Sequence, residues 1–322
     1  MSCYKVNLSL FSAALFLLSF VSLISAPEAI GAVDNPDLNG RITNADTGEN
    51  IGYAHLYLEQ AGTGTASGPD GRFRLRSSLI SVNPSEETLR VSAIGYETLR
   101  ITLSDVMENP NSIILKLKPS VSERETALVM GDRMRSGKAN NTNFWWRMGI
   151  NRGSVGNYNP QPTDHVSYGL AQPVSIEKDH PVRLRYAEIA IGSISQMGRS
   201  LNETKDSPSD SLLLRFSMVN VGEDGLPGDE NLISEQILKT VAARSQKIKV
   251  DLSDHDIIVE KSFFLIIELL IEDPETYHNY FPLFEAINTG TRNYHRYYPH
   301  KPWSQNSLRY FSEIMYEVGY EY

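Results

Sequence analysis

The chain has 322 residues, of which 41% are hydrophobic and 21% are charged. This composition is too apolar for a disordered tail, and the length suffices for one or two domains with their own hydrophobic cores. Thirty Lys and Arg against 39 Asp and Glu give a formal net charge of −9, and no basic face is clustered in the sequence, which argues against nucleic acid as a partner.

The N-terminal segment, residues 1–32, is predicted to be a secretory signal peptide. Leu8–Ala26 is an almost uncharged apolar run that follows Lys5 and ends in small residues. Pro27 disfavours cleavage after the alanine that precedes it, so we expect cleavage after Ala32. An uncleaved membrane anchor is the alternative, because about 20 apolar residues span a bilayer. The mature protein is expected in the periplasm or at the outer membrane.

The chain has one cysteine, Cys3, which precedes the apolar run. Cleavage leaves a mature chain without cysteine, which excludes disulfides and thiol catalysis. Cys3 also lies on the wrong side of the run to be the lipid-modified cysteine of a bacterial lipoprotein.

Residues 38–118 show the two-residue alternation of half-buried β-strands. The alternation runs through Leu89–Ala93, breaks at Ile94–Tyr96 and resumes over Leu99–Leu103. With the flanking strands and those described next, this gives six or seven short strands and predicts a small antiparallel sandwich. The flanking strands are Leu38–Thr43 and Ile113–Leu117.

Two more strands are predicted between these segments, each with a core side and a solvent side. The arginines of the second strand are interpreted as a solvated strand face. The two sides are Ala54, Leu56 and Leu58 against His55, Tyr57 and Glu59, and Phe73 and Leu75 against Arg72, Arg74 and Arg76.

Glycine and aspartate mark the turns between the strands. Gly48, Gly71 and Gly95 are expected at backbone angles that a side chain disfavours. The Asp70 carboxylate is expected to accept a hydrogen bond from the turn backbone. Calcium at Asp70 is the alternative, but a single carboxylate is far from the six to eight oxygen ligands that Ca²⁺ takes.

The turn and strand residues of this region also follow a recurring order. They are Asp46, Thr47, Gly48, Gly64, Asp70, Gly71, Phe73, Ser92, Gly95 and Tyr96. Their spacing resembles the carboxypeptidase-regulatory-like domain of exported Bacteroidota proteins, with Ala66 where a threonine is usual. The resemblance covers about a quarter of the chain. It implies a transthyretin-like β-sandwich, usually non-catalytic and attached to another domain, and does not imply peptidase activity.

A second domain, residues 126–322, is predicted after a polar linker at residues 119–125. Met134–Asn143 is rich in small and polar residues and is expected to be a loop, with Thr126–Met130 before it as a candidate strand. The alternating segments that follow predict a second all-β domain. They are Val182, Leu184 and Tyr186 against Arg183 and Arg185; Leu212, Leu214, Phe216 and Met218; and Ile248, Val250 and Leu252 against Lys247, Lys249 and Asp251.

Phe263–Leu270 is apolar on both faces apart from Glu268, which is typical of a central strand covered on two sides. A buried Glu268 would need a partner. Ile233, Ile237 and Val241 recur at a spacing of four, which by itself favours a helix.

The segments around this ambiguous stretch resemble the C-terminal β-sandwich that is commonly paired with the regulatory-like domain in the same bacteria. The matching pieces are the strand and D-G-x-P-G loop of Leu214–Leu232, the V-D-L-S segment from Val250 and the F-F-x-x-x-E strand ending at Glu268. The resemblance implies a jelly-roll-like sandwich, and for this reason we interpret Ile233–Val241 as mostly strand.

No motif in the sequence predicts catalysis. No histidine is followed by glutamate three residues later, as a zinc carboxypeptidase requires, and H-E-x-x-H, G-x-S-x-G and phosphate-binding loops do not occur. His295 and His300 are interpreted as surface histidines, with a metal site as the alternative. The acidic loop Gly222–Glu230 is interpreted as a solvated turn around Gly225 and the Pro227–Gly228 pair, with structural calcium or paired catalytic carboxylates as alternatives. No catalytic residue, metal or cofactor is predicted.

Aromatic residues are the most unusual feature of the second half. Exposed flat rings stack on sugars, whereas buried rings fill a sandwich core and brace loops, which is the simpler interpretation. The candidate ligand-binding residues in loop-like contexts are Trp145, Trp146, Tyr297, Tyr298 and Trp303.

These observations predict a non-catalytic, exported binding or interaction protein of the bacterial cell envelope, with carbohydrate as a candidate ligand. The alternatives are a glycan- or peptide-degrading enzyme whose active site the sequence does not reveal, and a structural envelope component. The sequence names no partner; an envelope glycan and an outer-membrane protein are the candidates.

Overall fold

The computed structural model describes two β-sandwiches and leaves several segments outside the description. The predicted signal peptide and Cys3, most of the linker and the candidate strand Thr126–Met130 lie outside the described residues, so these assignments stay predictions. The described residues are 36–120, 134–141, 152–155, 167–191, 211–242, 246–270, 284–287, 293–296, 302–305 and 313–322.

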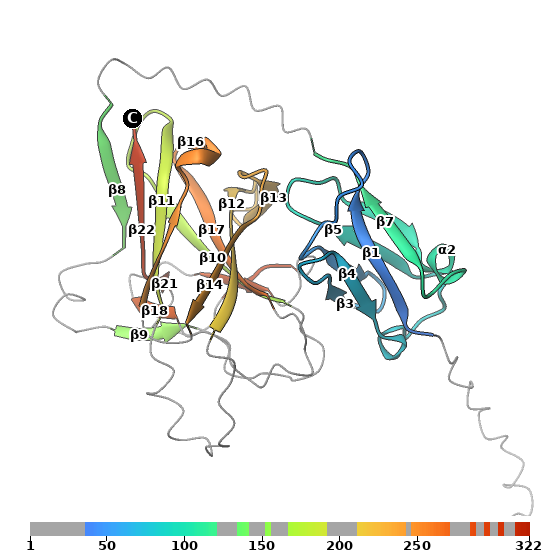
Figure 1. Ribbon diagram of the computed structural model, residues 1–322. Coiled ribbons are helices and arrows are strands. Elements are labelled where there is room, and N and C mark those ends of the chain that lie inside the picture. The colour runs from blue at the N-terminus through green and yellow to red at the C-terminus, as the bar shows by residue number, and fades with distance from the viewer. Residues whose placement is uncertain are drawn as a thin grey trace, which may run out of the picture. The chain divides into compact units, whose positions relative to one another are not determined.

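The first sandwich consists of two sheets (Figure 1). Its three-stranded sheet has the order β4-β1-β7 and its four-stranded sheet the order β3-β2-β5-β6. The seven strands confirm the predicted number. They are β1 Leu38–Asn44, β2 His55–Leu58, β3 Thr63–Ala66, β4 Arg72–Leu75, β5 Thr88–Ser92, β6 Leu99–Thr102 and β7 Ile113–Leu117.

Side-chain alternation places the first core between these two sheets. Phe73 and Leu75 of β4 are buried while Arg72 and Arg74 are exposed. The same pattern holds in β7, where every second residue from Ile113 is buried. Both strands therefore have the core and solvent sides that their sequences predict.

Three details of the first sandwich differ from the prediction. Strands β1 and β7 pair in parallel, so the sandwich is not wholly antiparallel. Leu103 does not extend β6 but begins a short helix, α2 (Leu103–Met107), because Leu103 and Val106 bury one helical face. His55 and Tyr57 were expected to face solvent, yet both are buried. For His55, this is because the outer face of β2 is covered by an arginine from the second sandwich, described below.

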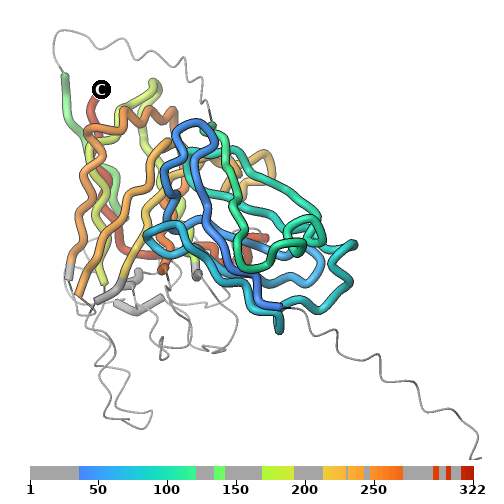
Figure 2. Tube along the Cα trace, turned by 45° about the vertical axis from the view of Figure 1, so that its right-hand side comes forward, coloured from blue at the N-terminus to red at the C-terminus, as the bar shows by residue number. Residues whose placement is uncertain are grey.

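In the second sandwich, a seven-stranded sheet packs face to face with an eight-stranded sheet. The first has the order β13-β12-β17-β10-β19-β20, with β14 also paired to β12. The second has the order β21-β18-β11-β22-β8, with β15 and β16 paired to β11 and β9 to β18. The C-terminal β22 therefore lies between β11 and β8 (Figures 1 and 2).

The bounds of these strands complete the description of the second sandwich. The seven-stranded sheet contains β10 Ser167–Ser175, β12 Ser211–Val221, β13 Pro227–Asn231, β14 Ile237–Ala242, β17 Ser262–Leu270, β19 Tyr294–Arg296 and β20 Ser304–Gln305. The eight-stranded sheet contains β8 Ser136–Asn140, β9 Arg152–Val155, β11 Val182–Ile191, β15 Gln246–Asp251, β16 Ile258–Val259, β18 Phe284–Ile287, β21 Glu313–Ile314 and β22 Tyr316–Glu321.

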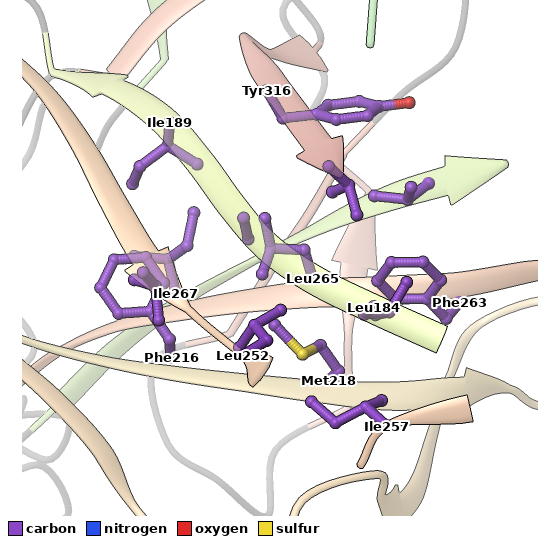
Figure 3. Packing of buried hydrophobic residues seen from close by; sticks show 14 of the residues in the cluster. Leu184, Ile189, Phe216, Met218, Leu252, Ile257, Phe263, Leu265, Ile267 and Tyr316 are labelled. Atoms are coloured by element: carbon purple, nitrogen blue, oxygen red, sulfur yellow. The ribbon is translucent and has the colours of Figure 1, made fainter. Parts of the chain in front are cut away.

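The larger core lies between these two sheets. Phe216, Leu265 and Ile267 from the seven-stranded sheet pack toward Leu184 and Ile189 from the eight-stranded one (Figure 3). Strand β17 lies between β12 and β10 and is buried along all but its first residue, which confirms it as a central strand. The predicted fold class, two β-sandwiches with little helix, is therefore confirmed.

Two loops predicted in the second domain are partly strands. Ser136–Asn140 within the expected loop 134–143 forms β8, because it pairs along β22 and buries Ala139. In the acidic segment, Gly225 does take a positive φ of 78° in the turn. Pro227 and Gly228, however, begin strand β13 and pair with β12 instead of completing the turn. In the stretch Ile233–Val241, which was ambiguous between helix and strand, the part from Ile237 forms β14, as predicted, while residues 233–236 precede the strand.

Strand β11 contains a bulge that overturns one core assignment. Leu184 pairs with Tyr320 and Tyr186 with Gly319, so two steps on β11 match one step on β22. The extra residue shifts the alternation by one position. Tyr186 therefore points outward instead of into the core, and Ala187 and Ile189 are buried in its place.

We predict that Gly95→Val destabilises the protein by more than the same change at Gly48. Both glycines have positive φ, 83° and 73°, which a β-branched residue resists at a cost of about 1–2 kcal/mol. A Cβ at Gly95 would also collide with the carbonyl oxygen of Ser234, whereas a Cβ at Gly48 has no atom within 4 Å. Denaturant unfolding should show a loss of about 1–3 kcal/mol for Gly95→Val. Equal losses for the two variants would contradict the Ser234 contact.

Candidate functional site

Of the five aromatic residues that are candidates for ligand binding, the structure describes only Trp303. The other four, Trp145, Trp146, Tyr297 and Tyr298, lie outside the described residues. Trp303 is partly buried and packs on a small apolar cluster on the outer face of the seven-stranded sheet. The Arg296 guanidinium lies 4.1 Å from the centre of its ring. In these contacts the ring braces the sheet, as the simpler interpretation expects.

Beside Trp303 the same face of the sheet holds a buried ion pair. Arg215 of β12 lies directly opposite Glu268 of β17 in the strand register. The Arg215 Nε lies 2.9 Å from the Glu268 Oε2, and the two side chains are 2% and 5% exposed. This pair confirms the prediction that a buried Glu268 has a partner. A second guanidinium, that of Arg296, lies 3.8 Å from the other Glu268 oxygen.

The remaining donors of Arg215 bond to the first sandwich, which belongs to the same compact unit, Pro36–Tyr322. Arg215 Nη1 donates to the backbone carbonyl of Tyr53 at 2.9 Å, and Nη2 lies 2.9 Å from His55 Nε2. Because a guanidinium only donates, the His55 ring accepts through an unprotonated nitrogen. Nearby, Gln236 Nε2 donates to the carbonyl of Gly52 at 2.9 Å.

This cluster is a structural element rather than a binding surface. Its charged groups are enclosed. Arg215 donates to Glu268 and to the Tyr53 carbonyl, while the neighbouring Gln236 amide donates to the Gly52 carbonyl. One feature of the sequence indicated this cluster, because Arg215 and Glu268 are single charged residues within largely apolar strands.

A second cluster lies on the outward face of the eight-stranded sheet. We call it the Tyr186 platform, consisting of Tyr186 of β11, Lys138 of β8, Lys249 of β15 and Glu317 of β22. The Tyr186 ring lies across Gly319, where a Cβ would collide with the ring. A side chain at this position would therefore displace the tyrosine from the sheet.

Hydrogen bonds and cations surround the rim and upper face of this ring. The Tyr186 hydroxyl donates to Glu317 Oε1 at 2.6 Å, and Lys138 Nζ donates to the same oxygen at 2.7 Å. Lys249 Nζ lies 3.8 Å from the ring centre. The platform thus combines a flat ring with a carboxylate acceptor and two ammonium donors.

The electrostatics of the platform follow from these contacts. Hydrogen bonds from Lys138 and then from Tyr186 lower the pKa of Glu317 below its ordinary value of 4.5. Burial, followed by the hydrogen bond to Glu317, raises the pKa of Tyr186 above 10.0. The hydrogen bond to Glu317 raises the pKa of Lys138. At neutral pH the platform therefore carries a neutral phenol between fixed charges.

Sequence reasoning missed this platform because it assigned Tyr186 to the core. The bulge at Arg185 that turns the ring outward depends on the pairing with β22, which lies more than 130 residues away in the chain. Gly319 in an otherwise bulky strand was the available signal, since a glycine in a strand marks close approach by another group.

The other candidate positions do not assemble into a metal site among the described residues. His295 lies in β19, and burial lowers its pKa, while His300 is outside the description. Asp70 accepts a hydrogen bond from the Arg72 amide, and Asp224 from that of Leu226, as turn-forming carboxylates do. In the described part of the chain, no three His, Cys, Asp or Glu side chains gather closely enough to hold a metal ion. No helix there has the length and apolar character needed to cross a membrane.

Comparison with known families identifies the first sandwich. Residues 38–129 match the family model of the CarboxypepD_reg-like domain, so the resemblance inferred from the turn residues is confirmed. The chain thus contains a CarboxypepD_reg-like domain followed by a second β-sandwich. Among curated proteins, no significant match to the chain was found.

Several solved structures show a distant likeness to this chain. The cysteine protease and lectin-like domains of Cwp84, a surface layer associated protein of Clostridium difficile, align over 48% of this chain and 32% of that one, with 7% identity and a TM-score of 0.30. A proposed carbohydrate binding protein from Bacteroides uniformis aligns over 79% of this chain and 99% of that one, with 11% identity and a TM-score of 0.20. A Bacteroides fragilis protein of unknown function, proposed to be membrane-associated, aligns over 77% and 97%, with 10% identity and a TM-score of 0.18.

These likenesses extend no activity or ligand to this chain, because their TM-scores are far below 0.5. The chain also spans only about a third and about half of the first two similar structures, both of Cwp84.

We predict that the stabilising effect of the Glu317 charge disappears in acid. Because its pKa is lowered in the folded state, the charge stabilises the fold above pH 4.5, and this stabilisation is lost as the pH falls through the folded pKa. Glu317→Gln keeps an acceptor for the Tyr186 hydroxyl and removes the charge. Its melting temperature should be about 1–2 °C below wild type at pH 7, a small effect because the pair is exposed. The difference should shrink as the pH falls below 4.5 and through the lowered folded pKa; a difference that stays constant throughout the acid titration would contradict this assignment.

Proposed function

We propose that this chain is an exported, non-catalytic binding protein of the bacterial cell envelope and that carbohydrate is its ligand class. The Tyr186 platform is the observation that carries the proposal. Once the Lys249 ammonium moves aside, a ring laid flat on a sheet can stack on the apolar face of a sugar, and the groups at its rim match the sugar's hydroxyls. Glu317 accepts hydrogen bonds, and Lys138 and Lys249 donate them.

Magnitudes favour weak, displaceable binding at this platform. The Lys249 ammonium now lies over the ring, and an exposed cation–π contact is worth about 0.5–1 kcal/mol. Stacking contributes about 0.5–1.5 kcal/mol by analogy with aromatic pairs, so a sugar can replace the ammonium on the ring. The displaced lysine remains near enough to donate to a hydroxyl. With a few hydrogen bonds, a total of about 4 kcal/mol corresponds to a Kd of ~1 mM.

The architecture supports binding rather than turnover. The first sandwich matches the CarboxypepD_reg-like domain. The resemblance to this family implies a domain that is usually non-catalytic and attached to another domain. The charged side chains of the buried cluster are committed to structural contacts. The apolar Leu8–Ala26 segment supports export.

We predict that Tyr186→Ala weakens binding to neutral polysaccharides by about 2- to 10-fold while the protein stays folded, with a melting temperature lowered by only a few degrees. Isothermal titration or affinity electrophoresis against a panel of neutral glycans measures this loss. Tyr186→Phe keeps the ring and should bind nearly as well as wild type. Tyr322→Ala is the matched control, because Tyr322 also carries a lysine ammonium, 3.9 Å from its ring centre, but lies outside the platform.

Equal losses of glycan binding for Tyr186→Ala and Tyr322→Ala would contradict a binding role for the Tyr186 platform. Reproducible hydrolysis of a polysaccharide or peptide by the purified protein would overturn the non-catalytic assignment. Export is checked by mass spectrometry of envelope fractions, which should find a mature N-terminus near Val33.

A further inference from the structure

The outward face of the β4-β1-β7 sheet carries a line of positive charge. Alternation along these strands turns Arg72 and Arg74 of β4, Arg41 of β1 and Lys116 of β7 toward solvent, and all four are exposed. The opposite side of the same sheet faces the first core. We call these four residues the basic stripe.

The strand register shows that the basic stripe runs diagonally across the sheet. Arg74 lies opposite Asn39, Arg72 opposite Arg41, and Lys116 opposite Thr43. Asn39, Arg41 and Thr43 follow one another at two-residue steps on β1. The cations therefore advance along β1 while they cross from β4 to β7, forming a line and not a compact disc.

Part of this charge is left without a counter-ion. Asp70 pairs with Arg72 at 3.5 Å and Asp37 with Arg74 at 2.8 Å, but no ion pair to Arg41 or Lys116 occurs among the described residues. Arg41 and Arg72 also lie directly opposite each other, and like charges in this relation destabilise a sheet. The line of cations is therefore neutralised only in part, and an anion bound beside Arg41 and Lys116 would contribute favourably on a chain with a net charge of −9.

An apolar side chain lies beside the centre of the stripe. Ile114 is 62% exposed, and it neighbours Arg41 on β7 in the register. It offers an apolar contact next to the charged line.

We propose that the basic stripe binds a linear acidic polysaccharide, one that carries carboxylate or sulfate groups along its chain. A linear polyanion matches a diagonal line of cations, and Ile114 can contact the apolar face of a sugar ring beside it. This inference rests on the proposed carbohydrate-binding function and adds a second site, on the CarboxypepD_reg-like domain, separate from the Tyr186 platform.

Affinity electrophoresis of the full chain in gels containing alginate, dextran sulfate or neutral dextran tests the proposal. Wild type should be retarded by alginate, by dextran sulfate or by both, and not by neutral dextran through this site. Which of the two acidic polymers binds distinguishes carboxylate from sulfate recognition. The Arg41→Gln/Lys116→Gln variant should bind about 10-fold more weakly, since each exposed cation contributes about 3- to 5-fold. Added salt should weaken the binding, because exposed charges are screened.

The matched control is Lys239→Gln/Lys261→Gln, which removes the same charge from exposed lysines of the second sandwich. It should retain wild-type binding. Equal losses for the two double variants would overturn the proposal, because binding would then depend on net charge alone. Tyr186→Ala should also keep its binding to acidic polymers. The experiment therefore distinguishes a wrong assignment of the basic stripe from a wrong assignment of the Tyr186 platform.

Two other outcomes would also overturn the proposal. One is the absence of retardation by either acidic polymer. The other is flotation with phosphatidylglycerol vesicles that depends on Arg41 and Lys116 while neither polysaccharide binds, which would assign the stripe to a membrane surface. Melting temperatures of both double variants should match wild type. If Arg41→Gln/Lys116→Gln melts at a lower temperature, its weaker binding could reflect lost folding, and Ile114→Ser then tests the stripe independently. That variant leaves the charges in place and should weaken alginate or dextran sulfate binding by about 2-fold; unchanged binding would count against the stripe.

Discussion

The buried ion pair between Arg215 and Glu268 is the constraint on which much of the rest depends. Removing two charges from water costs several kcal/mol per ion, and this is tolerable only if geometry and further hydrogen bonds compensate. Here the strand register places the two side chains directly opposite each other. The donors of Arg215 that Glu268 does not use reach the Tyr53 carbonyl and His55. One arginine thus fixes the β12–β17 register and accounts for a buried histidine in the first sandwich.

The position of the buried ion pair limits which sheet faces can bind a ligand. The seven-stranded sheet has the main core on one face (Figure 3) and the enclosed Arg215–Glu268 cluster with Trp303 on the other. Outward-facing polar surfaces are found on the eight-stranded sheet, where Tyr186 lies on Gly319, and on the β4-β1-β7 sheet, where the basic stripe runs. The two proposed sites are therefore on sheets other than the one that carries the buried charges.

Local pattern was sufficient to predict much of the fold and little of the site. Alternation identified β4, β7 and β15, and the positive φ at Gly95 followed from the break it makes in a strand. The lone charge in Phe263–Leu270 indicated a buried pair but not its partner. The parallel pairing of β1 with β7, the β8 edge strand and the bulge at Arg185 were missed, because each depends on a strand distant in sequence.

The central claim is that Arg215 and Glu268 stabilise the fold as a coupled pair, and a double-mutant cycle in denaturant tests it most directly. Arg215→Met leaves a buried carboxylate and Glu268→Leu a buried guanidinium, so each single change should cost about 3–5 kcal/mol. The double variant should cost at least about 2 kcal/mol less than the sum, because neither charge is then left unpaired. Additive losses would mean that the two side chains stabilise the protein independently and would contradict this account.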